Sequence, residues 1–357
     1  YMAEAGMNPI LVNADRGSSW RNIGGGRTAF SLPELAEIAA QNHHIFKELQ
    51  YLSNIDYKPI RYISFAHDEE TYKTLEASKA WSKAEMIAPK QFREEISPYF
   101  NANPKKYISA LVSEDCWQAT PGKVVDLVRN LGIAAGGTVM EDCRVLEACR
   151  EGKYTSVLVQ THDKKYVEYR TEHFVNALGS GAGKLCDSMG IDAGLYPVRH
   201  QAFITRRLPM LGKHGTNLDM LIDRQDYKGF SAVYGQQIAY TGQIIGCASP
   251  KLDAMRIDKN LKVNTKAFLE IVSEMFSEWI PDLAGVGIQA VWAGYYTEPR
   301  YIVDPELGLF VGMRGHGFML SQYIARMYVD KLLGRPVPEY FEKLKLNGPG
   351  LSEKAFK

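Results

Sequence analysis

The sequence lacks the clustered cysteine and histidine residues that bind metals or form disulfide frameworks. Its five cysteines include no CxxC pair and are odd in number, and its eight histidines show no HxxxH or HExxH spacing. A zinc site or a disulfide scaffold is therefore disfavoured. We expect free thiols in a reducing compartment and no bound metal.

An excess of charge of one sign and a long apolar run are also missing. The net charge is +1, which gives no electrostatic footprint for a nucleic acid. No apolar run approaches the roughly 20 residues that cross a bilayer. The segment Tyr1–Gly6 lacks the basic and apolar parts of a signal peptide. The sequence therefore predicts a cytoplasmic protein. Attachment to a membrane surface stays open, and it would require a partner protein.

The chain does contain an alternation of helix and strand patterns over its 357 residues. Tyr1–Gly6 fits the end of a helix with a glycine cap, Pro9–Asn13 a strand, and Gly17–Arg27 a glycine-rich loop. Ser31 and Glu34 have the spacing of a capping box, which predicts a following helix of about 20 residues. This order is typical of the second half of a βαβ dinucleotide-binding unit.

The rest of the chain continues this alternation and predicts an α/β protein (α+β overall) with two intertwined domains. The strand candidates are Ile60–Phe65, Tyr107–Val112, Gly136–Ala148, Tyr154–Gln160, Tyr166–Arg170, Phe174–Leu178, a stretch from Val198 to Gly246, and Leu309–Gly312. The further helix candidates are Thr120–Leu131, Lys262–Trp279 and a segment that ends at Leu333.

Glycine-rich turns at predicted strand–helix junctions occur three times, at residues 17–27, 179–183 and 315–317. Such turns expose backbone N–H groups at the positive end of a helix dipole, which suits phosphates or an electron-rich ring edge. Composition alone does not separate a nucleotide enzyme from a plain α/β protein.

Several segments, in order along the chain, resemble the signatures of one enzyme family. Ile10–Ser19 resembles the end of its second strand, and Arg21–Gly26 is similar to its RNGGG loop. The other segments are Asn176–Ala182 and Pro197–Gln201, similar to AAGAWS and PVRGQ, and Gly308–Ser321, similar to the C-terminal GHGFMLS signature. The family is the FAD-dependent D-amino-acid oxidase superfamily, in the branch of sarcosine oxidase, glycine oxidase and dye-linked amino-acid dehydrogenases.

The resemblance implies a Rossmann-like FAD-binding domain interleaved with a substrate domain built on an antiparallel sheet. The FAD-binding domain would comprise residues 1–60, 118–195 and 290–335, and the substrate domain residues 61–117 and 196–289, with residues 336–357 as a tail. Gly294 stands where sarcosine oxidase carries its flavin-linking cysteine, so the resemblance implies non-covalent FAD.

The cofactor-binding residues implied by the resemblance come from each of these segments and from a strand near residue 145. They are Asn13, Ser19, Arg21, Asn22, Gly24, Gly25, Val145, Gly179, Ser180, Gly181, Gly315, His316, Gly317, Phe318 and Met319.

The sequence departs from the family pattern at two places that concern FAD. The family begins with a strand and a GxGxxG turn, whereas Tyr1–Gly6 resembles the end of the helix that follows that turn. Either the sequence starts late, which we favour, or another chain supplies the strand, or FAD binding is lost. The family also usually has Glu where Asn13 stands, accepting hydrogen bonds from the adenosine ribose.

The resemblance implies that an amino acid or small amine transfers a hydride from its α-carbon to flavin N5. An amino-acid carboxylate needs a cation, and Arg27 is the first candidate and Arg300 the second. Met319 replaces the lysine that anchors the carboxylate in sarcosine oxidase. Tyr296 is a further catalytic candidate, within a possible aromatic wall that also includes Tyr234, Tyr240 and Tyr295.

A dehydrogenase is favoured over an oxidase because Gln243 stands near the position of the lysine that promotes the reaction of sarcosine oxidase with O2. A dehydrogenase needs an electron acceptor, and another subunit of a complex is one candidate, which leaves a hetero-oligomer open. Two alternatives stay open: a non-catalytic or assembly subunit of an oxidoreductase complex, and a 2-hydroxy-acid oxidoreductase.

Overall fold

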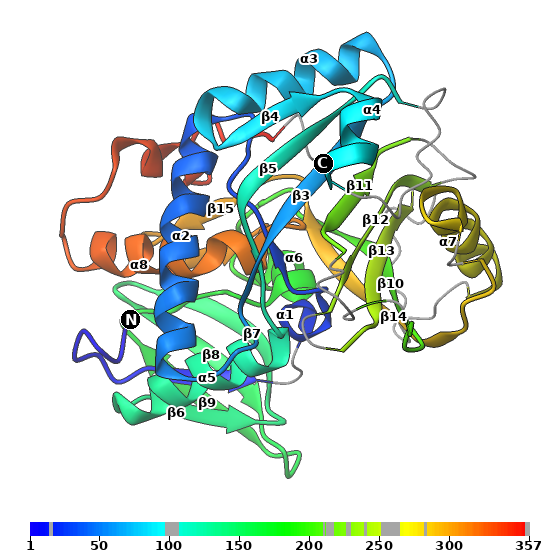
Figure 1. The fold of residues 1–357 in the computed structure, drawn as a ribbon. Coiled ribbons are helices and arrows are strands. Elements are labelled where there is room, and N and C mark those ends of the chain that lie inside the picture. Colours follow the sequence, from blue (N-terminus) through cyan, green and yellow to red (C-terminus); the bar gives the residue numbers. More distant parts are fainter. Residues whose placement is uncertain are drawn as a thin grey trace. The chain divides into compact units, whose positions relative to one another are not determined.

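The protein is seen in a computed structural model that divides into two compact units (Figure 1). Unit 1 comprises Tyr1–Arg21, Gly122–Pro197 and Tyr295–Leu351, and unit 2 comprises Asn22–Pro121, Val198–Gly294 and Ser352–Lys357. The structure describes residues 1–13, 17–96, 107–209, 211, 218–225, 230–238, 241–250, 265–281 and 284–353. Tyr240 lies outside these residues.

Unit 1 contains a pair of short parallel strands, a β-meander and several helices. Its strands are β1 (Ile10–Asn13), β6 (Thr138–Glu141), β7 (Arg144–Glu151), β8 (Tyr154–Gln160), β9 (Tyr166–Thr171), β15 (Ile302–Asp304) and β16 (Leu309–Val311). Its helices are α1 (Gly17–Arg21), α5 (Pro121–Ala134), α6 (Ala182–Ser188) and α8 (Gly317–Leu332), with 3-10 turns at Gly179–Gly181 and Glu339–Leu344.

Within the part of the chain that the structure describes, the strands of unit 1 form three separate sheets and no continuous Rossmann sheet. β1 pairs with β6 in parallel, β15 with β16 in antiparallel, and β7–β8–β9 form an antiparallel meander. Among the described residues, β1 pairs on one side only, and its Ile10 and Leu11 are 50% and 52% exposed. The alternating burial along β8 shows why the meander forms, because every second side chain enters a small core.

Unit 2 is built on one large sheet with the strand order β14-β10-β13-β12-β11-β3-β5-β2, and β4 also pairs with β5. Its strands are β2 (Gly25–Gly26), β3 (Lys58–Ala66), β4 (Ala84–Ile87), β5 (Ser109–Gln118), β10 (Tyr196–Thr205), β11 (Met220–Asp223), β12 (Phe230–Gln237), β13 (Ile244–Pro250) and β14 (Ile288–Glu298), of which β10 and β14 extend into unit 1. Its helices are α2 (Pro33–Leu52), α3 (Glu69–Ala77), α4 (Pro89–Gln91) and α7 (Thr265–Trp279), with irregular turns at Ser78–Trp81 and Phe92–Ile96.

Helix α7 packs on this sheet through one apolar stripe. Phe268, Val272, Phe276 and Trp279 follow helical spacing and belong to the main buried cluster of unit 2. Phe203 of β10 meets the ring of Phe276 edge to face, with the centroids 5.3 Å apart. The amphipathic pattern predicted here is thus confirmed for the described part of the helix.

The α/β class and most predicted elements are confirmed, but three local predictions are wrong. Ser31 does not cap α2, because Leu32 is the N-cap residue, Pro33 starts the helix, and the N–H of Ser31 binds the buried carboxylate of Glu353 at 3.0 Å. The other two errors are the glycine-rich loop at Gly17–Arg27, which contains α1 and β2, and the strand Phe174–Leu178, which is reduced to one parallel bridge between Asn176 and Leu309. The predicted helix end at Tyr1–Gly6 is confirmed as a single turn, in which Ala5 N–H bonds Tyr1 O and Gly6, with φ +78, is the cap.

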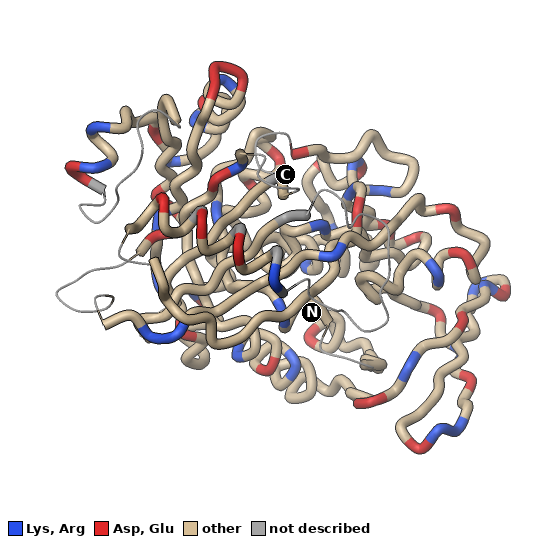
Figure 2. Tube along the Cα trace, turned by 90° about the vertical axis from the view of Figure 1, so that its right-hand side faces the viewer, with Lys and Arg blue, Asp and Glu red and all other residues tan. Residues whose placement is uncertain are grey.

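Basic and acidic residues are interspersed along the described chain, as the coloured trace in Figure 2 shows. No helix among the described residues combines the length and the apolar character needed to cross a bilayer.

One histidine lies in the aromatic core of unit 2. The ring of His43 stacks on the buried Trp117 with the centroids 4.5 Å apart, and its Nε2 atom hydrogen-bonds Tyr57 Oη at 2.7 Å. The pKa of His43 is lowered to about 4, chiefly by burial and also by the charge of Lys47, while Asp115 acts in the opposite direction. The folded protein therefore holds His43 neutral down to mildly acidic pH.

We predict that His43 makes unit 2 sensitive to acid. Because its folded pKa lies below the unfolded value of 6.5, its contribution is complete above pH 6.5 and is lost as the pH falls towards 4. Between pH 7 and pH 5 this loss amounts to about 2 kcal/mol. A His43→Phe variant keeps an aromatic ring on Trp117 but cannot be protonated. Its free energy of unfolding, measured in urea, should therefore fall by about 2 kcal/mol less than that of the wild type between pH 7 and pH 5. The exposed His44 is the control, and equal pH dependence of the wild type and His43→Phe would contradict the prediction.

Candidate functional site

The sequence-predicted site residues fall in both units, and each half is described by itself. In unit 1, Asn13 and Glu141 end the two parallel strands β1 and β6 and are register partners. The Nδ2 atom of Asn13 donates to Glu141 Oε2 at 2.9 Å. Arg129 of α5 donates through Nε to Oε1 of the same carboxylate at 2.8 Å. A carboxylate therefore lies beside Asn13, and sequence reasoning missed it because the two residues are 128 positions apart.

Val145 and helix α6 belong to the apolar cluster beside β1, and the turn at Gly179–Gly181 precedes α6. Val145 packs with Val12 of β1 in a cluster that includes Leu185 of α6. The turn leads directly into α6, whose start has no side-chain cap. The predicted residues Ser180 and Gly181 are thus at a helix start, as expected, although the helix is short.

Asn176 fixes this turn and is a second residue whose role sequence reasoning missed. It is completely buried. Its Nδ2 donates to Ala182 O at 3.0 Å, and its Oδ1 accepts from the N–H of Leu178 at 3.2 Å. Its backbone bonds Gly308 and Phe310 across the neighbouring strand β16. An Asn immediately before a glycine turn is the only sequence signal for this role.

The start of α8 brings together most of the remaining predicted residues of unit 1. Gly315 packs so closely on Tyr296 that any Cβ there would overlap its ring. The buried His316 bonds Tyr301 Oη through Nδ1 at 2.5 Å and is the N-cap residue without a side-chain cap bond. Gly317 then begins a helix of 16 residues with its positive dipole end at this point. Phe318 and Met319 lie in the first turn, Met319 being buried.

Helix α1 is tied to the same region. Ser18 donates through Oγ to Tyr295 O at 2.6 Å, next to Tyr296. Ser19 and Arg21 are therefore held in unit 1 near the residues that precede Gly315.

In unit 2, neighbouring atoms of the same chain leave no room for side chains at the glycines of the predicted flavin loop. Gly24 has φ +80, and a Cβ there would overlap Ala119 O. A Cβ on Gly25 would overlap Tyr62 Oη, and β2 pairs with β5 at this point. Asn22 closes the turn, because its Oδ1 accepts from the N–H of Gly24 at 2.8 Å.

Arg27, directly after this loop, is almost fully buried at 3% exposure. Its guanidinium lies 3.9 Å from the ring centroid of Phe30 and donates to Ala29 O. A second guanidinium, that of Arg224, is close enough to feel its charge. Burial lowers the pKa of Arg224 to about 10, Arg27 lowers it further, and Glu353 raises it. Arg224 and Glu353 were missed by sequence reasoning because neither belongs to a motif.

Arg300, the other candidate for a carboxylate, has a different environment. Its guanidinium donates to the carbonyls of Leu346 and Gly348 in unit 1, the latter at 3.2 Å. These bonds tie down the segment that follows α8. The role of Arg300 in catalysis stays a prediction.

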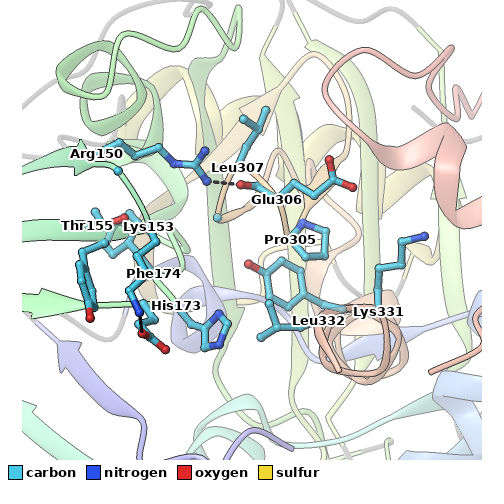
Figure 3. Close-up of a pocket in the computed structure, with 15 residues that line it drawn as sticks. Arg150, Lys153, Thr155, His173, Phe174, Pro305, Glu306, Leu307, Lys331 and Leu332 are labelled. Atoms are coloured by element: carbon cyan, nitrogen blue, oxygen red, sulfur yellow. Dashed lines mark hydrogen bonds and ion pairs between the residues drawn. The ribbon is translucent and has the colours of Figure 1, made fainter. Parts of the chain in front are cut away.

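A cavity of about 370 Å³ lies at the other end of α8 (Figure 3). Tyr328 and Leu332 form part of its wall, together with Phe174 and Leu307. Its cations have partners: Arg150 bonds the carbonyl of Glu306, Lys153 the carboxylate of Glu172, and Lys331 that of Glu342. No predicted cofactor residue lines this cavity. Several predicted cofactor residues are at the start of α8, and the helix is about 24 Å long at 1.5 Å per residue, so the cavity at its other end is far from them. We therefore do not assign this cavity as the active site.

The residues of unit 1 fit FAD. Asn13 and Glu141 are polar acceptors suited to ribose hydroxyls, and the neighbouring Val145 is apolar. Gly315 leaves no room for a side chain at the start of α8. The positive end of that helix suits the flavin edge near N1, where reduction places negative charge.

Comparisons with known proteins agree with this fit. The chain matches the family model described as FAD dependent oxidoreductase (DAO) over residues 1–331. It resembles L-proline dehydrogenase from P. horikoshii with a TM-score of 0.79 and 22% identity over 97% of this chain and 92% of that one. It resembles glycine oxidase from Geobacillus kaustophilus with a TM-score of 0.79 and 16% identity over 97% and 93%.

A third similar structure is L-alpha-glycerophosphate oxidase from Mycoplasma pneumoniae with FAD bound. Its TM-score is 0.69, with 15% identity over 91% of this chain and 88% of that one. No curated protein matches the sequence. Because the family match covers residues 1–331, this chain belongs to the DAO family of FAD-dependent oxidoreductases, and the prediction of FAD as its cofactor is confirmed.

Proposed function

We propose that this protein is an FAD-dependent dehydrogenase of α-amino acids. The observation that carries the proposal is the buried guanidinium of Arg27, which directly follows the loop predicted to lie beside the flavin. A desolvated guanidinium binds a carboxylate through two parallel hydrogen bonds, which orients the substrate as well as holding it. Relatives whose names give amino acids as substrates, such as the proline dehydrogenase and the glycine oxidase, support this substrate class.

The electrostatics of unit 2 favour a carboxylate over a neutral amine. Arg224 lies close enough to the guanidinium of Arg27 and to the fully buried carboxylate of Glu353 to feel both charges. Arg224 stays protonated at neutral pH, since even its lowered pKa is about 10. Burying like charges together is costly, so an added substrate carboxylate stabilises the cluster.

In the proposed mechanism, Arg27 holds the carboxylate while Phe30 and the surrounding buried groups exclude water. FAD supplies the hydride acceptor. The substrate amine reacts in its neutral form, and the protein contributes mainly position rather than acid–base chemistry. We propose that unit 1 holds FAD non-covalently and that unit 2 carries the carboxylate-binding group. The role of Tyr296 in catalysis stays a prediction.

The preference for a dehydrogenase rests on Gln243. Its side-chain amide donates to Thr205 O at 2.9 Å and to Gln289 Oε1 at 2.6 Å, and it carries no charge. A cation near the flavin would stabilise superoxide as it forms. Without one, electrons would pass to another acceptor, which we propose is a partner subunit or a soluble carrier.

We predict that Arg27→Met selectively impairs oxidation of carboxylated substrates. Each amino acid is compared with its decarboxylated amine, for example proline with pyrrolidine, by anaerobic bleaching of the flavin and by kcat/KM. Loss of a charge-assisted carboxylate bond of about 2–3 kcal/mol should lower kcat/KM for the amino acid roughly 100-fold. The amine should change less than about threefold.

Arg300→Met is the matched comparison for Arg27→Met. If Arg300→Met instead produces the selective loss, the carboxylate anchor is Arg300. If 2-hydroxy acids bleach the flavin and amino acids do not, the substrate class is wrong. A purified, folded protein or complex without flavin absorbance would support a non-catalytic subunit instead.

We predict that the wild type reduces an artificial dye at least tenfold faster than it consumes O2. Gln243→Lys adds a cation and should raise O2 consumption, measured with an oxygen electrode, by about tenfold (about 1.4 kcal/mol). Gln289→Lys, at its hydrogen-bond partner, controls for charge added nearby. Rapid O2 consumption by the wild type would show that the protein is an oxidase.

A further inference from the structure

We propose that Glu141 supplies the carboxylate that binds the adenosine ribose of FAD, in place of an acidic residue at position 13. This proposal rests on FAD binding and is independent of the amino-acid substrate. It assigns a cofactor-specificity role to a residue that belongs to no sequence motif.

The position of Glu141 follows from the parallel pairing of β1 and β6. Asn13 and Glu141 are the last residues of their strands and lie opposite each other in register. In open α/β sheets, ligands bind outside the carboxyl ends of the strands. The carboxylate of Glu141 is 45% exposed at this edge, so a ligand can reach it.

The turn after β6 directs the chain back to the same edge. Asp142 has φ +53, and the N–H of Cys143 donates to Asn13 O at 3.1 Å. Val145 follows two residues later and packs against the cluster that contains Val12. The polar pair Asn13 and Glu141 therefore lies next to the apolar Val145. This arrangement suits adenosine, because its ribose hydroxyls need polar partners and its flat base needs an apolar contact.

The hydrogen bonds at Glu141 hold its carboxylate in a fixed orientation. Asn13 donates to Oε2 at 2.9 Å, and Arg129 binds Oε1 through Nε at 2.8 Å and Nη2 at 2.7 Å. Both oxygens of an ionised carboxylate act only as acceptors, so a ribose hydroxyl is a suitable donor to this group. The Oδ1 atom of Asn13 is a second acceptor for the neighbouring hydroxyl of a ribose diol.

The charge at this edge selects a plain ribose over a phosphorylated one. A ribose 2′-phosphate needs an arginine that faces it. Here the guanidinium of Arg129 binds Glu141, whose own charge would repel a phosphate. The pair thus fits FAD and disfavours a 2′-phosphorylated dinucleotide.

If the ion pair between Arg129 and Glu141 only stabilised the fold, removal of the charge of Glu141 would not change the Kd for FAD. Exposed ion pairs contribute about 0–1 kcal/mol to stability and have no effect on cofactor choice. Binding of FAD and of FMN, which lacks the adenosine, separates the two roles.

The test measures the Kd of the deflavinated protein for FAD and for FMN by quenching of flavin fluorescence. Glu141→Gln keeps the size of the side chain and removes its charge. We expect its Kd for FAD to rise about tenfold (about 1.4 kcal/mol), because a charge-assisted bond to the ribose becomes a neutral one, while the Kd for FMN stays within twofold. Glu151→Gln, an exposed carboxylate on β7, should leave both values unchanged.

An exchange of the two residues provides the rescue. The double variant Asn13→Glu and Glu141→Asn keeps one carboxylate and one amide at the same register pair, so we expect the Kd for FAD to return to within threefold of the wild type. A Glu141→Gln protein that binds FAD as tightly as the wild type, or that loses FMN equally, overturns the proposal. Absence of saturable FAD binding in the wild type overturns it as well, whereas loss of amino-acid oxidation with intact FAD binding affects only the proposed function.

Discussion

The buried amide of Asn176 holds together the part of unit 1 on which the cofactor site depends. Its side chain closes the turn before α6, and its backbone bridges to Leu309 and bonds Gly308 and Phe310. Because β16 leads to the start of α8, one residue connects the starts of α6 and α8, both of which are predicted to face the cofactor. A buried amide satisfied on both sides specifies one geometry, since any shift leaves a polar group without a partner in the core.

Local patterns in the sequence were sufficient where a feature depends on neighbours along the chain. The apolar stripe of α7 and the alternation of β8 gave the correct elements because helix and strand periods differ clearly. The capping box at Ser31 failed because a distant carboxylate, Glu353, binds that N–H and Pro33 sets the helix start. Tertiary contacts overrode local propensity there.

The candidate site shows the same division. The start of α8 and the turn at Gly179–Gly181 carry recognisable signatures, and the structure places helix starts at both. Glu141, Arg224 and Glu353 carry no signature, because their positions follow from strand register and from packing between segments far apart in the chain. A single sequence contains no direct record of such pairings.

The glycines at positions 24–26 have a consequence for how flavoproteins are recognised. Ala119, Tyr62 and Trp117 occupy the space that side chains would need there. The run of glycines is therefore demanded by the protein interior, whatever the loop binds. A related protein that had lost its redox activity would still need glycine at these three positions. A glycine-rich signature of this kind is therefore better evidence of common ancestry than of a bound nucleotide.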